Sequence, residues 1–128
     1  MATIRSYTTI EQSRKLAEIL SLESADMHYF IADSLEKQEI NYAVRCGTPI
    51  VKTDIPCWSL AALFNYLREI DFFPNIEVDE HSISMSISYY DEEEARPLAP
   101  VHNVIVEADT FVDACVAMIE KLYEQKIL

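Results

Sequence analysis

The chain of 128 residues has one glycine, three cysteines and no long apolar run, and each of these shortages excludes a class of protein. Phosphate-cradling loops and dinucleotide-binding folds need several glycines where the backbone approaches the ligand, so we expect no nucleotide cofactor held in these ways. Cys46, Cys57 and Cys115 are too few and too widely spaced for a metal knuckle or a CxxC redox pair. We therefore expect no cofactor and a reduced interior.

Long apolar segments are also absent. No window approaches the roughly 18 unbroken apolar residues of a membrane span. Residues 1–20 include charged side chains such as Arg5, Glu11 and Lys15, which leave no room for the apolar core of a signal peptide. The sequence thus predicts a cytoplasmic protein that does not enter a membrane.

Basic residues are scarce, and the charge is unevenly distributed. The 10 Lys and Arg against 22 Asp and Glu give a net charge of -12. Residues 1–64 hold 6 basic and 8 acidic residues, whereas residues 65–128 hold 4 and 14, so the second half carries -10 of this charge. Because nucleic acids and anionic lipids are bound through Lys and Arg, we expect no direct nucleic-acid binding. The charge is compatible with a protein partner that has a basic surface, and a homo-oligomer is not excluded.

The common catalytic signatures are missing, since there is no GxSxG or HExxH motif. A small enzyme with an unrecognised site could still combine Asp26, His28 and Cys57, because Asp26 and His28 are two residues apart and Cys57 precedes a predicted helix. His81 lies beside Asp79 and Glu80, and His102 is on a strand expected to pair nearby. Together with Asp26 and His28 they could be drawn as a metal site, but we interpret them as surface histidines in an acidic chain. We predict neither catalytic residues nor metal ligands.

Hydrophobic periodicity predicts three helices. The first follows Thr9, which forms a capping-box pattern with Gln12, and the last follows Thr110, with Asp113 three residues on. The second has apolar residues at helical spacing after Pro56, a residue suited to a first helical turn. In order, the helices are expected in residues 10–20, 58–70 and 111–123.

Alternation of apolar and polar residues predicts the strands. The clearest is Ser82–Tyr89, in which every second residue is serine, as in an antiparallel strand with one wet face. Residues 40–46 and 48–52 are expected to form a hairpin turning at Gly47. Further strands are expected at residues 27–32, 75–78 and 101–106. The whole chain, residues 1–128, is then a single α+β domain, with an antiparallel sheet of about three to five strands and three helices packed mainly on one face.

The acidic stretch suggests where a partner would bind. Between Glu69 and Asp113 there are 12 Asp and Glu, and Arg96 is the only basic residue. At the predicted hairpin tip, two tyrosines precede four acidic residues, and we name as candidate partner-binding residues Tyr89, Tyr90, Asp91, Glu92, Glu93 and Glu94. The leading hypothesis is a non-enzymatic interaction protein. The alternative is an acidic DNA mimic that inhibits a nucleic-acid-binding enzyme.

Three parts of the chain resemble a known family. These are residues 9–20 with 23–27, residues 56–63 (Pro-Cys-Trp-Ser-Leu-Ala-Ala-Leu), and residues 108–115 with 118–124. They are similar to small uncharacterised proteins of gut anaerobic bacteria, often associated with prophage or other mobile elements. The resemblance implies a bacterial accessory protein of mobile-element origin. It implies no activity, because the similar residues are helix caps and apolar helix faces.

Overall fold

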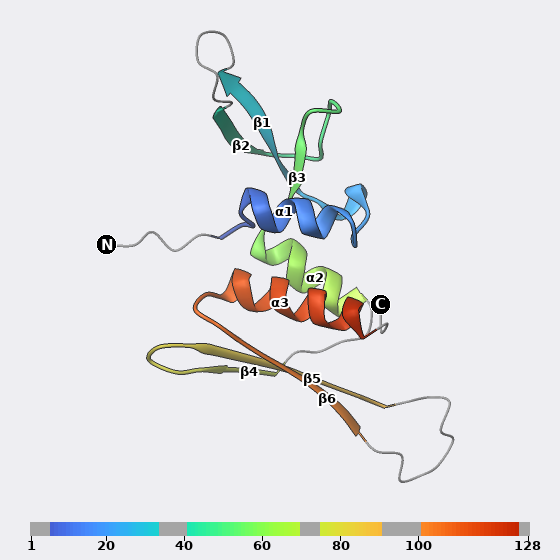
Figure 1. Cartoon of the computed structure of the whole chain (residues 1–128), viewed down its shortest axis with the longest axis vertical. Coiled ribbons are helices and arrows are strands. Elements are labelled where there is room, and N and C mark those ends of the chain that lie inside the picture. The colour runs from blue at the N-terminus through green and yellow to red at the C-terminus, as the bar shows by residue number, and fades with distance from the viewer. Residues whose placement is uncertain (1–5, 34–40, 70–74, 91–100, 126–128) are drawn as a thin grey trace.

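The computed structural model describes residues 6–33, 41–69, 75–90 and 101–125. Figure 1 shows the order of the elements, which are three α-helices, one short 3₁₀ helix and six strands. They are α1 (Ile10–Ala17), η1 (Leu22–Ser24), β1 (Met27–Asp33), β2 (Asn41–Cys46), β3 (Ile55–Cys57), α2 (Leu60–Glu69), β4 (Asn75–Val78), β5 (Ile83–Tyr90), β6 (Val101–Ala108) and α3 (Phe111–Glu124). The expected α+β class is confirmed.

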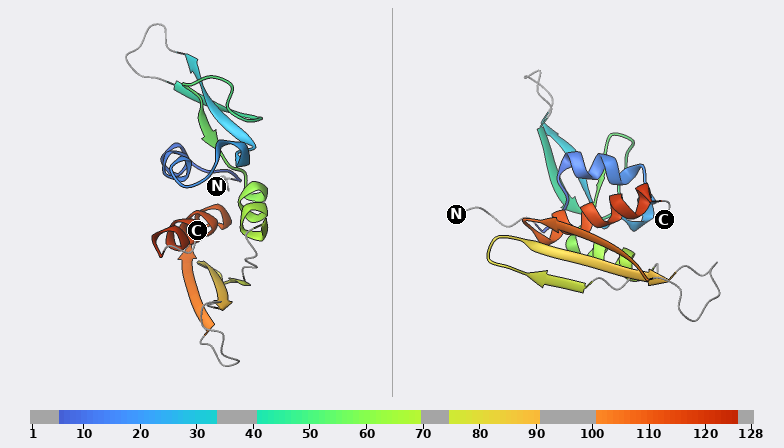
Figure 2. Two further views of the ribbon diagram at one scale, coloured as in Figure 1. Left: turned by 90° about the vertical axis from the view of Figure 1, so that its right-hand side faces the viewer. Right: turned by 60° about the horizontal axis from the view of Figure 1, so that its bottom comes forward.

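The described strands are divided between two antiparallel sheets, each of three strands. The order is β2-β1-β3 in the first sheet and β4-β5-β6 in the second. In Figures 1 and 2 the three α-helices lie between the sheets, with α1 next to the first and α3 next to the second. The wide apolar surface of α3 explains this middle position, because it packs against β5 and β6 on one side and against α2 on the other.

Both predicted N-terminal caps are present. The Thr9 hydroxyl accepts the backbone N–H of Gln12, and the Gln12 side chain accepts the N–H of Thr9, which completes a capping box at α1. The Thr110 hydroxyl accepts the N–H of Asp113 at the start of α3. The Gln12 amide also donates to the Asp113 carboxylate at 2.7 Å, so the two helix starts are joined.

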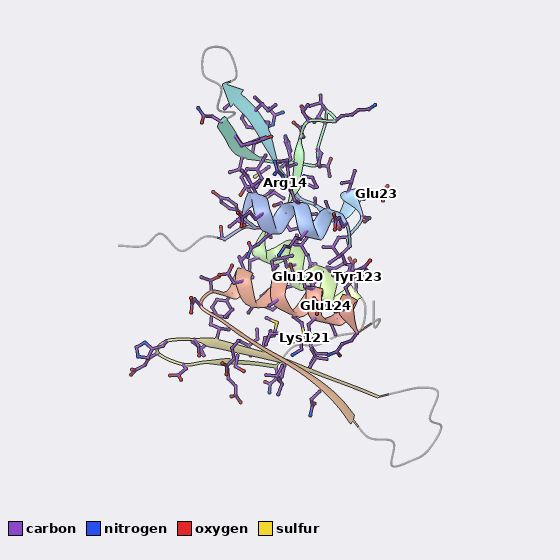
Figure 3. All side chains as sticks on the ribbon, in the orientation of Figure 1. Arg14, Glu23, Glu120, Lys121, Tyr123 and Glu124 are labelled. Carbon is purple, nitrogen blue, oxygen red and sulfur yellow. The ribbon has the colours of Figure 1, made fainter. Side chains whose placement is uncertain are left out.

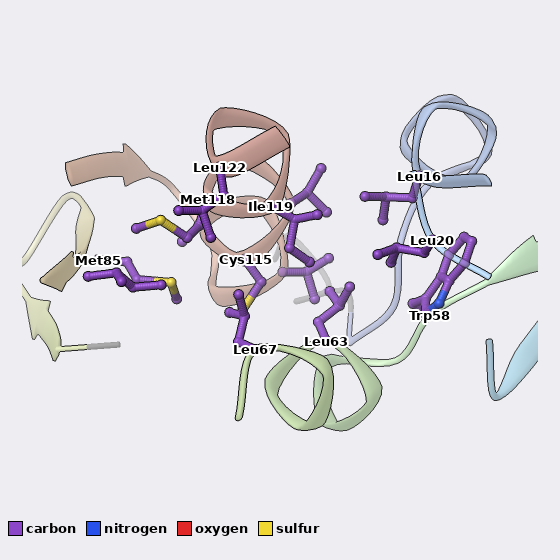
Figure 4. Packing of buried hydrophobic residues seen from close by; sticks show 14 of the residues in the cluster. Leu16, Leu20, Trp58, Leu63, Leu67, Met85, Cys115, Met118, Ile119 and Leu122 are labelled. Atoms are coloured by element: carbon purple, nitrogen blue, oxygen red, sulfur yellow. The ribbon is translucent and has the colours of Figure 1, made fainter. Parts of the chain in front are cut away.

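The hydrophobic core lies among the helices and on the inner face of the second sheet (Figure 4). Trp58 is fully buried at one end of it, and Met85 of β5 lies at the other. Seven residues of α3 are buried: Val112, Ala114, Cys115, Val116, Met118, Ile119 and Leu122. No residue of β1 or β2 belongs to this cluster, so the first sheet extends from the core rather than enclosing it.

The predicted hairpin at Gly47 is wrong. Strand β2 pairs with β1, in a register that joins Met27 to Cys46 and Tyr29 to Val44, and residues 48–52 form no strand. Both β2 and β3 run antiparallel to β1, so they are parallel to each other and residues 47–54 form a crossover loop between them. Gly47 begins this loop with a φ of 108°, a conformation that favours glycine.

Pro56 lies in a strand, not in the first turn of a helix as predicted. It is the middle residue of β3 and stands opposite His28 of β1, and α2 begins only at Leu60. The neighbouring pairs Met27 with Cys57 and Tyr29 with Ile55 flank it. Since β3 is at the edge of the sheet, the missing N–H of Pro56 can face away from β1 without loss of a ladder hydrogen bond.

Candidate protein-interaction surface

The second sheet has one buried face and one uncovered face. Ile83, Met85 and Ile87 of β5 are at most 7 % exposed beneath α3. The alternate residues Ser84 and Ser86 point the other way, as the serine pattern predicts. In Figures 1 and 2 no described element covers that side. We call it the outer face, and its described side chains are Asn75, Glu77, Ser84, Ser86, Asn103, Ile105 and Glu107.

Strand register places an apolar side chain among the polar ones. Ser86 stands between Asn75 of β4 and Ile105 of β6 in adjacent pairs, and Ile105 is 54 % exposed. Ser84 stands between Glu77 and Glu107 in the same way. Two strand spacings separate these carboxylates, roughly 10 Å. The outer face therefore has an exposed isoleucine beside a row that has a carboxylate at each end.

More carboxylates lie at the end of the sheet where β4 turns into β5. The three strands are paired there through Val78, Ile83 and Ala108. This pairing brings the exposed Asp79 and Glu80 of the turn close to Asp109, which follows β6. Residues 75–90 and 101–110 contain neither Lys nor Arg. This end of the face is consequently negative and has no neutralising charge on its own strands.

A lysine lies at the edge of the sheet. The Lys121 ammonium of α3 donates to the main-chain carbonyl of Ile105 at 3.1 Å, and Figure 3 labels it on the side of α3 toward this sheet. The lysine therefore protects the outer backbone edge of β6, while the Ile105 side chain stays exposed on the outer face.

The candidate residues of the acidic hairpin tip are not placed by the structure. Tyr89 and Tyr90 end β5, where their backbones pair with His102 and Val101, and their side chains lie outside what the structure describes. Asp91, Glu92, Glu93 and Glu94 lie outside the described residues. Their role in binding stays a prediction.

The structure does not bring Asp26, His28 and Cys57 together as a catalytic site. Cys57 is paired with Met27 and His28 with Pro56, so the thiol and the imidazole are on opposite faces of the sheet. Burial raises the pKa of the Cys57 thiol, with hydrogen bonds to Thr8 acting in the opposite sense. A buried thiol that holds its proton is a poor nucleophile.

His28 instead holds the crossover loop. Its Nδ1 is 2.7 Å from the Gly47 carbonyl, which can only accept, and its Nε2 is 2.6 Å from Arg45 Nε, which can only donate. The neutral Nδ1–H tautomer satisfies both contacts. At the other end of the loop, an Asp54 carboxylate oxygen lies 3.9 Å from His28 Nε2, so the fully buried imidazole lies between the two ends of the loop.

Asp54 orders the tip of the same loop. One of its carboxylate oxygens accepts the backbone N–H groups of Ile50 at 2.9 Å and Val51 at 3.1 Å. These two hydrogen bonds are the main reason that the pKa of the carboxyl group is lowered. The nearby positive charge of Arg45 acts in the same direction, and burial acts against them. The side chains of Ile50 and Val51 stay exposed to solvent at the tip.

Asp26 has a structural role at the start of α2. Its two carboxylate oxygens accept the backbone N–H and the hydroxyl of Ser59, and the Ser59 hydroxyl accepts the N–H of Ala62. The carboxylate borders a cavity of about 440 Å³ between η1 and α2, whose walls include Glu23, Asn65 and Tyr66. Burial raises the pKa of the Tyr66 phenol in this wall. Both oxygens of Asp26 are thus already engaged in holding the helix.

Neither a metal cluster nor a membrane helix is found in the part of the chain that the structure describes. No group of three or more His, Cys, Asp or Glu side chains among residues 6–33, 41–69, 75–90 and 101–125 is placed to hold a metal ion. Within the same ranges, no helix has both the length and the apolar character needed to cross a bilayer.

Comparison of the chain with protein-family models, with curated proteins and with solved structures finds no match. The resemblance of its three segments to a family of mobile-element proteins therefore stays a prediction. The function must be argued from the geometry of the surface.

Proposed function

We propose that this protein is a non-enzymatic interaction protein that binds a protein partner with a basic surface through the outer face of β4-β5-β6. The observation that carries the proposal is the exposure of Ile105, 54 % accessible, on a sheet face that has carboxylates and no basic residue on its strands. The bacterial mobile-element origin rests on the sequence resemblance alone and forms the less specific part of the proposal.

The chemistry of the face suits such a partner. Glu77 and Glu107 can pair with Lys or Arg side chains around an apolar contact made by Ile105, which gives the polar rim and apolar centre typical of protein interfaces. The carboxylates at the turn of β4 and β5 extend the negative field and would steer a positive partner toward the sheet. Association should therefore weaken as salt is added.

The face is also rigid before binding. Its other side is the buried surface of β5 and β6 against α3, so the outer side chains stand on strands that the core already holds. A surface ordered in advance loses little conformational freedom when a partner binds. This favours the sheet face over an exposed loop as the principal contact.

A DNA mimic would use the same face on a narrower class of partner. The carboxylates that would pair with Lys and Arg of any basic protein would then occupy the phosphate sites of a nucleic-acid-binding enzyme. The two proposals differ in whether DNA and this protein compete for the partner. That competition is the measurement that separates them.

The experiment is site-specific photo-crosslinking in the source cells. Ile105 is replaced by benzoylphenylalanine, and the matched control carries it at Leu22 of η1, which is 55 % exposed and outside the sheet. We expect a discrete adduct from position 105, no such adduct from position 22, and loss of the adduct when Glu77→Lys and Glu107→Lys are added.

Equal adducts from both positions, or an adduct that persists after the charge reversal, would contradict the proposal. With the partner purified, excess duplex DNA provides the second measurement. Competition by DNA would support the mimic, and its absence would leave the general interaction protein.

A further inference from the structure

The open edge of β2 is a second surface with unused hydrogen-bonding groups. The backbone N–H of Gly47 donates to the Asp26 carbonyl at 2.7 Å, which makes this pair a hydrogen-bonded one in the antiparallel ladder. Arg45 and Ala43 then turn their main-chain groups toward β1. Those of Tyr42, Val44 and Cys46 turn away from it, and within the described ranges no other segment bonds to them.

The other sheet edges are protected or charged, and β2 is not. At the edge of β3, Pro56 lacks the N–H that a new strand would need. At the edge of β6, Lys121 occupies the carbonyl of Ile105. Strand β4 has four residues and carries Glu77. Strand β2 has six residues and neither proline, glycine nor lysine, the devices by which edges are usually blocked.

The charged residue of β2 does not block its edge either. Arg45 Nε donates to His28, and the guanidinium lies over the Phe30 ring, 4.4 Å from its centroid. Both contacts hold the side chain over its own sheet, on the face opposite Tyr42 and Val44. The edge of β2 therefore presents half-buried apolar side chains together with main-chain groups that bond to no other described segment.

We propose that β2 pairs with β2 of a second copy of this chain, antiparallel about a twofold axis through Val44, to form a continuous six-stranded sheet. This register places Val44 opposite itself and Tyr42 opposite the partner's Cys46. All three residues have their main-chain groups on the open edge, so the pairing makes about six new backbone hydrogen bonds.

The distribution of charge supports a second copy as the occupant. Residues 65–128 carry -10 of the net charge of -12, and their sheet lies at the opposite end of the molecule from β2 (Figure 1). Pairing through β2 keeps the two acidic halves far apart. Pairing through β4 or β6 would bring Glu77 or Glu107 toward its own symmetry mate.

The contact is small, so we expect a weak dimer with a Kd in the range of about 10 to 100 µM. Sedimentation velocity from about 5 to 500 µM is then the measurement. The wild-type mass should rise from 14.7 kDa toward twice that value. Val44→Lys places a charge at the axis and should weaken dimerisation at least tenfold, whereas Leu22→Lys, on η1, should dimerise like the wild type.

A disulfide tests the register independently of affinity. Tyr42→Cys stands opposite the partner's Cys46 and should give a covalent dimer under mild oxidation, while Tyr42→Cys with Cys46→Ser should not. A wild type that stays monomeric at about 500 µM, or a Val44→Lys variant that dimerises like the wild type, would overturn the proposal. These outcomes leave the outer-face proposal unaffected, since that face lies on the other sheet.

Discussion

Thr8 provides the sharpest test of the packing between the N-terminal segment and the core. Its hydroxyl, which is fully buried, lies 2.7 Å from the Ser13 hydroxyl and accepts the backbone N–H of Trp58 at 3.2 Å. Its own N–H donates to the Trp58 carbonyl, and its carbonyl accepts the Tyr29 hydroxyl. Thr8 thus joins the segment before α1 to β1 and to the residues before α2.

The substitution Thr8→Val keeps the shape of the side chain and removes only the hydroxyl. The N–H of Trp58 and the hydroxyl of Ser13 then lose a partner, and each of these losses costs about 1 to 3 kcal/mol. The Cys57 sulfur, a weak acceptor 3.5 Å from the Thr8 hydroxyl, loses a partner as well and adds little to this cost. We expect the free energy of unfolding to fall by about 2 to 4 kcal/mol, because the Ser13 hydroxyl can rotate and recover part of its cost. Against a total of about 5 to 15 kcal/mol this is a large fraction.

Urea unfolding followed by Trp58 fluorescence measures the effect, because Trp58 is the only tryptophan and is fully buried. With a denaturant slope of about 2 kcal/mol/M, the middle of the usual range in urea, the midpoint should fall by about 1 to 2 M. Ser13→Ala completes a double-mutant cycle. The double variant should cost about 1 to 2 kcal/mol less than the sum of the single ones, because no Ser13 hydroxyl is left without a partner. A midpoint shift below about 0.3 M, or additive costs, would refute this account of Thr8.

Two further predictions concern titratable groups. Burial raises the pKa of Cys57 and raises that of Cys115 to about 12. At pH 8 only the exposed Cys46 should therefore react with a thiol reagent. Rapid reaction of all three thiols in the folded protein would contradict the buried positions of Cys57 and Cys115. The folded-state pKa of Asp54 is lowered, so its contribution to the order of loop 47–54 is present above the unfolded value of about 3.9 and is lost as pH falls through the folded value. NMR shifts of the two amides that donate to Asp54, followed from pH 6 to pH 2, should titrate with a midpoint below about 3.9, and a midpoint above it would show that they do not bond to the carboxylate.

Local sequence patterns predicted the parts of the fold that depend on neighbouring residues. The capping box of Thr9 and Gln12 and the Thr110 cap are both confirmed, because each connects residues three apart. The serine alternation of β5 predicted one wet face, and that face is the uncovered one. These features need no knowledge of distant segments.

The crossover around Gly47 could not be predicted in that way. Residues 40–52 alternate as a hairpin would, yet β2 pairs with β1, and His28 holds the intervening loop from a distant strand. Local alternation cannot indicate which strand will be the partner. For the same reason the open edge of β2 could not be predicted. In the predicted hairpin this strand would have paired with residues 48–52 and would have presented a different edge.

The candidate site was predicted in part. The acidic stretch and the serine-lined strand pointed to the second sheet, whereas the position of Ile105 beside Glu77 and Glu107 depends on the pairing of three strands. Asp26 and His28 were considered as catalytic residues because a carboxylate and an imidazole stand two residues apart. Their hydrogen bonds, to Ser59 and across the crossover loop, could be recognised only in the folded chain.

The central claim is that the outer face binds a basic partner, and the affinity of the partner identified by crosslinking tests it most directly. Calorimetry compares the wild type with Glu77→Gln/Glu107→Gln and with Glu11→Gln/Glu18→Gln, which removes two exposed carboxylates from the region of α1. We predict that the Glu77→Gln/Glu107→Gln variant binds the partner at least tenfold more weakly and that added salt lowers the affinity further. The Glu11→Gln/Glu18→Gln variant should change the affinity less than twofold. Equal affinities for the two variants would contradict the claim.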